Sequence, residues 1–140
     1  MAALSADRVT EYKDWGMVMK SYPVNAASVI YKGSLVVIDT DGFARPGVDT
    51  ASFRVVGIAA ESVTGGAADG DVEVKVISGI LALLPASSIA ATDVPNIMFL
   101  VDDQTFDETT PANSVKVGRL HEYVSATSGW VHIPVGGTTE

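Results

Sequence analysis

Residues 72–84 read Val-Glu-Val-Lys-Val-Ile-Ser-Gly-Ile-Leu-Ala-Leu-Leu, and this stretch decides the fold class. Its first five residues alternate apolar and charged side chains, which is the period of a β-strand with one face in the core. We therefore expect the three valines to point inward and Glu73 and Lys75 to point into solvent.

The second half of the stretch, Ile80–Leu84, is continuously apolar and follows Gly79, which breaks the run. A strand without alternation is typical of burial on both faces. The second face could be covered within the same chain or by another subunit, and the sequence leaves both alternatives open.

Short runs rich in Val, Ile and Leu recur along the chain and are separated by turns rich in Gly and Asp. Such spacing predicts a mainly β fold, with a small β-barrel or β-sandwich body. In the segment 39–42, Asp39 is expected to start a hairpin turn and Gly42 to take a positive φ. Residues 87–93 are expected to form one helical turn. The strand-like runs are 34–39, 54–61, 72–77, 79–84, 97–101, 115–124 and 129–135.

Residues 1–28 lack this strand-and-turn pattern, and we interpret them as an N-terminal arm in front of a single β body at residues 29–140. A short helix from Ser5 to Glu11 is a weaker expectation. The arm carries aromatic and methionine side chains, which interfaces favour because they combine a large contact area with adaptability. The alternative is that they fold back onto their own body. The candidate partner-binding residues are Tyr12, Trp15, Met17 and Met19.

The composition bounds the class of partner. The chain has 140 residues, of which 47% are hydrophobic, and this is enough for the core of one domain. Seventeen Asp and Glu against nine Lys and Arg give a net charge of −8, which disfavours nucleic acid and anionic membranes as partners. There is no cysteine, so disulfides and the usual structural zinc sites are excluded. Synthesis in the cytoplasm is expected, because no apolar leader is recognisable.

Two histidines, His121 and His132, fall in the two strands of a predicted closing hairpin and could lie near each other. Two imidazoles alone do not make a metal or catalytic site. Strand alternation would also turn Glu122 to the face opposite His121. A solvated or packed pair is therefore favoured. Trp130 and His132 are expected on one face of their strand, and Val131 on the other.

The acidic segment 102–111 contains Asp102, Asp103, Asp107 and Glu108 and could supply oxygen ligands for Ca²⁺. Its spacing does not match an EF-hand, and a solvated surface loop is favoured. No spacing in the chain suggests a nucleophile with its base or a phosphate-binding loop. We expect no enzymatic activity, no cofactor and no metal.

Several segments, taken in order along most of the chain, are similar to the small capsid cement proteins, also called head decoration proteins, of tailed bacteriophages. Residues 12–15 lie outside this similarity. Each segment is a weak motif alone, and their order and spacing carry the resemblance. The similar segments are 1–8, 31–36, 39–42, 56–59, 72–74, 101–105, 117–119 and 130–133.

The resemblance implies a β-rich body on the outer capsid surface of the virion, made in the cytoplasm of a bacterial host. It further implies a homotrimer at local threefold axes and an extended N-terminal arm against the major capsid protein. It implies no catalytic residue. An alternative function is a virion surface module that binds a host glycan or receptor, for which an exposed Trp130 would serve. A small hydrolase or metal-dependent enzyme is a further alternative, which the absence of a credible site disfavours.

Overall fold

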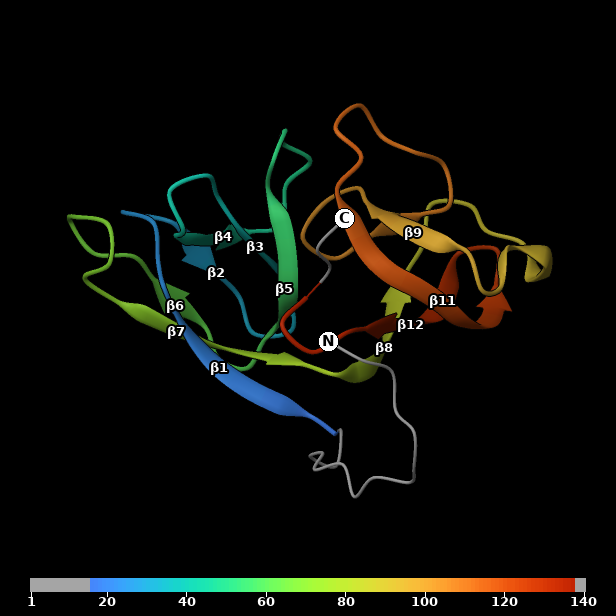
Figure 1. Ribbon diagram of the computed structural model, residues 1–140, viewed down its shortest axis with the longest axis horizontal. Helices are drawn as coiled ribbons and strands as arrows, with labels where there is room; N and C mark the ends of the chain where they lie inside the picture. The colour runs from blue at the N-terminus through green and yellow to red at the C-terminus, as the bar shows by residue number, and fades with distance from the viewer. Residues whose placement is uncertain (1–15, 138–140) are drawn as a thin grey trace, which may run out of the picture.

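The computed structural model describes residues 16–137, and its regular secondary structure is almost entirely β-strand (Figure 1). The first antiparallel sheet has the order β1 (Val18–Pro23), β7 (Glu73–Ser78), β5 (Arg54–Ala59), β3 (Leu35–Ile38), β4 (Ala44–Pro46). The second has the order β10 (Phe106–Asp107), β9 (Ile97–Leu100), β11 (Lys116–Ser125), β12 (Ser128–Ile133), β8 (Ile80–Pro85). A small pair joins β2 (Val29–Ile30) to β6 (Val63–Thr64). The predicted mainly β fold is confirmed, and the sheets include a half-barrel.

The two large sheets stand side by side and are joined by the stretch 72–84 (Figure 1). β7 ends at Ser78 and β8 begins at Ile80, so Gly79 alone makes the corner. Gly79 has a φ of +70°, and a Cβ atom there would lie 2.7 Å from the carbonyl oxygen of Gly16. Its amide donates to the carbonyl of Ile133 at 2.8 Å. Only glycine fits this conformation and this close approach without strain.

The predicted alternation is confirmed within β7, whereas Val72, the first of the three valines, precedes the strand and is only half-buried. Val74 and Val76 are 0% and 1% exposed, while Glu73 and Lys75 are exposed. The valines pack into a cluster that covers one face of the first sheet. A second cluster fills the space between the two sheets. β3 supplies both clusters, since Leu35 and Val37 belong to one and Val36 to the other, and this explains its unbroken apolar sequence.

The apolar run Ile80–Leu84 is buried on one face only within this chain. Leu81 and Leu83 are 44% and 51% exposed, while Leu84 is 7% exposed. Of the two alternatives, cover of the second face inside the same chain is not found among the described residues. The reason is that Ile80, Ala82 and Leu84 pack against the core, whereas Leu81 and Leu83 point to the outer face of the second sheet. Cover by another subunit stays a prediction.

The second half of the predicted arm differs from the structure. β1 pairs with β7 over six residues, from Val18 opposite Ser78 to Pro23 opposite Glu73. Val24, directly after β1, is 0% exposed in the core. Residues 18–24 therefore belong to the body. The sequence gives little sign of this strand, because an edge strand exposed along most of its length needs no apolar alternation. The helix expected from Ser5 to Glu11 lies outside the described residues.

The turn between β3 and β4 has the predicted chemistry, and Gly42 has a φ of +90°. The Asp39 carboxylate accepts hydrogen bonds from the amides of Asp41 and Phe43, each at 2.9 Å. It also accepts one from Nε of Arg45 at 2.8 Å, although the Asp39 side chain is only 3% exposed. The expected turn at residues 87–93 is present as a shorter 3₁₀ turn, η1 (Ala91–Asp93).

Two substitutions in β7 test its register. We expect Val74→Asp to lower the free energy of unfolding by several kcal/mol, because an unpaired carboxylate would be buried. Glu73→Ala, the neighbouring change on the exposed face, should shift stability by less than about 0.5 kcal/mol. Urea unfolding followed by circular dichroism measures both changes. Equal urea midpoints for the two variants would mean that the register of β7 is shifted by one residue.

The Asp39 turn makes stability depend on pH. Burial alone would raise the pKa of Asp39, but the bonds from Arg45, Phe43 and Asp41 outweigh burial and hold this pKa below its usual value. A lowered folded-state pKa stabilises the protein above the unfolded value and loses that contribution as pH falls through the folded value. The stabilisation is therefore present at pH 7 and disappears progressively below about pH 4.

Asp39→Asn should lower the free energy of unfolding at pH 7 by about 1–3 kcal/mol, since Arg45 and two amides lose a charged acceptor. The difference from wild type should shrink as pH falls below about 4, which urea unfolding across a pH series measures. Asp41→Asn is the matched control, because Asp41 is exposed. A constant difference between Asp39→Asn and wild type at all pH values would contradict this account.

Candidate interaction surfaces

The start of strand β1, together with Met17 directly before it, is apolar and exposed. Met17, Val18 and Met19 are 65%, 40% and 54% exposed. Because successive side chains of a strand point to opposite faces, both faces of β1 are bare here. One edge of β1 is bonded to β7, and no strand among residues 16–137 pairs with the other edge (Figure 1). A bare apolar edge strand is a feature that soluble proteins usually suppress.

Val135 extends this exposed region across the corner between the sheets. Val135 is 50% exposed, and its Cγ2 approaches Gly79 from the side of β12. Ser78 lies opposite Val18 in the β1–β7 register, and its hydroxyl accepts a bond from the Gly136 amide at 3.0 Å. We call Met17, Val18, Met19 and Val135 the β1 surface. It contains two predicted partner-binding residues, Met17 and Met19, whereas Tyr12 and Trp15 lie outside the described residues.

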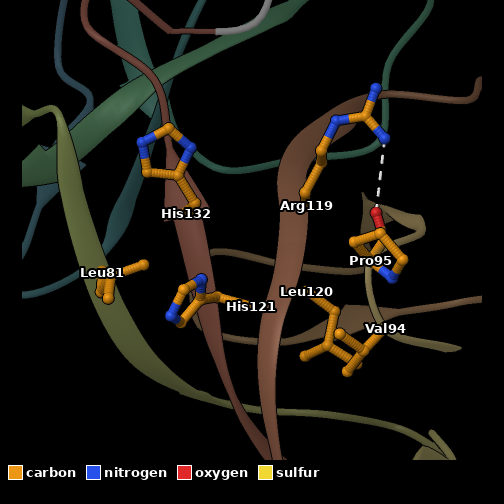
Figure 2. Close-up of a pocket in the computed structure, with 7 residues that line it drawn as sticks. All are labelled: Leu81, Val94, Pro95, Arg119, Leu120, His121 and His132. Carbon is orange, nitrogen blue, oxygen red and sulfur yellow. Dashed lines mark hydrogen bonds between the residues drawn. The ribbon is translucent and has the colours of Figure 1, made fainter. Parts of the chain in front are cut away.

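The outer face of the second sheet holds a groove of about 400 Å³. Strand register places three of its residues in one row, because His132 lies opposite Leu81 on β8 and opposite Arg119 on β11. Figure 2 shows the two imidazoles and Leu81 on one side of the groove and Arg119 with the Val94–Pro95 segment on the other. We call it the histidine groove. Its lining consists of Leu81, Val94, Pro95, Arg119, Leu120, His121 and His132.

Arg119 is held against one wall of the histidine groove. Its Nη1 donates to the carbonyl oxygen of Pro95 at 3.3 Å (Figure 2). Strands β11 and β12 lie very close together beside Arg119. A Cβ atom on Gly118 of β11 would collide with the carbonyl oxygen of His132 on β12. A glycine at this position therefore sets how near β11 lies to β12, and so how near Arg119 lies to the histidines.

His121 and His132 do lie in one site, as their places in the hairpin allowed. Simple alternation predicts that His121 and Glu122 point to opposite faces of β11. The alternation is interrupted at this point, because the β11–β12 register shifts between Leu120 and Glu122. A bulge inserts an extra residue and interrupts the two-residue period. Glu122 lies opposite Trp130, and both Glu122 and His121 are exposed. Trp130 is half-buried on the same face as His132, with Val131 buried on the other face, as predicted.

The acidic segment 102–111 is not a loop throughout, because β10 (Phe106–Asp107) pairs with β9 inside it and Phe106 is buried. Its carboxylates build its turns. Oδ1 of Asp102 accepts from the amides of Gln104 and Thr105 at 2.9 and 2.8 Å. Oδ1 of Asp107 accepts from the Glu108 amide at 2.8 Å. Within residues 16–137 no three His, Cys, Asp or Glu side chains converge as metal ligands would.

The sequence indicated part of these surfaces and missed the rest. It identified Met17, Met19 and the two histidines. It did not identify Arg119, Leu81 or the Val94–Pro95 segment as their neighbours, because that requires the register of three strands. Counted from the Ser125–Ser128 pair, a regular hairpin would place His121 opposite His132, and only the two register shifts bring Arg119 to that position.

No helix in the part of the chain that the structure describes is long and apolar enough to cross a membrane. No protein-family model matches the sequence, and no curated protein matches it significantly.

The acidic segment yields a prediction about metal. If it is a solvated loop, EDTA should leave the melting temperature unchanged, because no folding free energy depends on a bound ion. Any effect of millimolar Ca²⁺ should be reproduced by a monovalent salt at the same ionic strength. Differential scanning calorimetry measures both. A stabilisation specific to Ca²⁺ that disappears in Asp103→Ala would show a true ligand site.

Proposed function

We propose that this protein is a capsid decoration protein, which binds the outer surface of a phage head and stabilises contacts between neighbouring copies of the major capsid protein. It acts by binding and carries no catalytic residue or cofactor in this proposal. The segment-by-segment resemblance to such proteins supports it, and so does the mainly β body, which is the fold that the resemblance implies.

The β1 surface is the observation that carries the proposal. An edge strand with both faces exposed offers a partner two kinds of contact. The free edge of β1 has backbone groups that can pair with a strand of the capsid protein. Met17 and Met19 add apolar area that adapts to the shape of the partner. In a free monomer this area would remain in water.

The charge distribution agrees with attachment through this end of the chain. Residues 1–22 contain three basic and three acidic side chains and are neutral, so the whole net charge of −8 belongs to the rest. An acidic body repels other acidic surfaces and its own copies. A neutral segment can approach a partner without this repulsion.

Repetition on a capsid lattice makes modest contacts sufficient. A homotrimer, as the resemblance implies, presents three copies of the β1 surface at once. Once one copy is attached, the others act at a high effective concentration. Such a trimer bound across several capsid subunits would resist their separation when the head is under internal pressure.

The test is binding of the protein to heads that lack it. We expect the double variant Met17→Ser, Met19→Ser to fold normally, because both residues are exposed. It should co-sediment with heads at least about tenfold more weakly than wild type, since a loss of about 1.4 kcal/mol of contact is enough for this change. Val124→Ser is the matched control, because it removes a side chain of similar exposure, 51%, from the far end of β11.

Equal binding by the double variant and wild type would contradict attachment through the β1 surface. Failure of the wild-type protein to bind heads under any condition, or binding to free glycans instead, would contradict the proposed function itself. Circular dichroism of each variant checks that the body is intact.

A further inference from the structure

The histidine groove has a composition unlike the rest of the chain. Three of its seven lining residues carry or can carry positive charge, namely Arg119, His121 and His132. None of the seven is acidic, although the chain contains seventeen Asp and Glu. Both histidines of the chain lie in this one groove. The groove is therefore a locally basic spot on an acidic protein.

The remaining lining residues form an apolar wall. Leu81 and Val94 are 44% and 38% exposed, and Leu120 is fully buried beneath them. Backbone register fixes Leu81 beside His132, so apolar and basic groups are neighbours within the same groove. Apolar lining with a few convergent polar groups is the usual composition of a binding site.

We propose that the histidine groove binds an acidic peptide segment of a protein partner, in which an apolar side chain stands next to an Asp or Glu. The apolar side chain would contact Leu81 and Val94, and the carboxylate would face Arg119 and His121. The proposal rests on the groove alone and is independent of attachment to a capsid. A single carboxylate suits the site better than a nucleic acid, because the net charge of −8 would repel a chain of phosphates.

Other charged groups flank the groove. On β11, Glu122 follows His121, and Arg119 precedes it. Asp93 of η1 lies next to Val94, and its carboxylate is engaged by the Ala90 amide at 2.7 Å. β8 contributes only apolar groups to this face.

The experiment titrates the ¹⁵N-labelled full-length protein with two pentapeptides, blocked at both ends, of sequence Ala-Leu-Asp-Leu-Ala and Ala-Leu-Asn-Leu-Ala. Amide shifts in β8, β11 and β12 report occupancy of the groove. We expect the Asp peptide to bind about threefold to fivefold more tightly than the Asn peptide at about pH 6, as one exposed charge pair provides.

Three variants assign the effect to the groove. His121→Gln should reduce the ratio between the two peptides, because it removes a basic group from an exposed position. Glu122→Gln should tighten binding of the Asp peptide up to about threefold, because it removes a neighbouring negative charge. Lys75→Gln is the matched control, since it removes a positive charge from the first sheet, and it should change nothing.

Equal affinity for both peptides would overturn the proposal, because the groove would then be merely apolar. An absence of shifts at about 10 mM peptide would also overturn it. Equal loss in Lys75→Gln and His121→Gln would show nonspecific attraction. Sedimentation of the protein without peptide tests for self-association. If the protein self-associates and the same amide signals shift, the groove binds a second copy of the chain, and this would contradict a peptide partner.

Discussion

The bend at Gly79 is the constraint on which the rest of this structure depends. At this residue the chain passes from β7 in the first sheet to β8 in the second, so the two sheets are linked without a loop. β1 pairs with β7 before the bend, and β8 pairs with β12 after it. The bond from the Gly79 amide to Ile133 fixes the last strand at the same corner. Both candidate surfaces lie close to this corner, and their residues depend on it for their positions.

Much of the fold could be predicted because it follows from local rules. The alternation of residues 72–76 required one buried and one exposed face, and the structure has both. Asp39 and Gly42 have the side chain and the backbone freedom that their turn needs, and they occupy the expected positions. These features depend on the chemistry of a few neighbouring residues, which a sequence displays directly.

The features that escaped prediction depend on distant partners. β1 is a strand because β7 offers an unpaired edge, and its own side chains give little sign of this. Leu81 and Leu83 are exposed because they lie on the outer face of the second sheet, which the continuously apolar sequence of β8 conceals. The bulge at His121 comes from the pairing of β11 with β12. For the same reason the two histidines were visible in the sequence while the groove around them was not.

The two surfaces suit different tasks. The β1 surface is apolar and has an open strand edge, which suits attachment to a large protein lattice. The histidine groove is small and basic, which suits a short acidic segment. An acidic body with two such restricted regions can remain soluble and still be selective, because most of its surface repels other acidic proteins.

A reconstruction by electron cryomicroscopy of phage heads assembled without this protein, and then incubated with it, tests the central claim most directly. The proposed function predicts density for the β body on the outer surface of the head, with β1 against the capsid protein and the acidic remainder facing solvent. Heads without added density, or bodies attached through the face opposite β1, would contradict it.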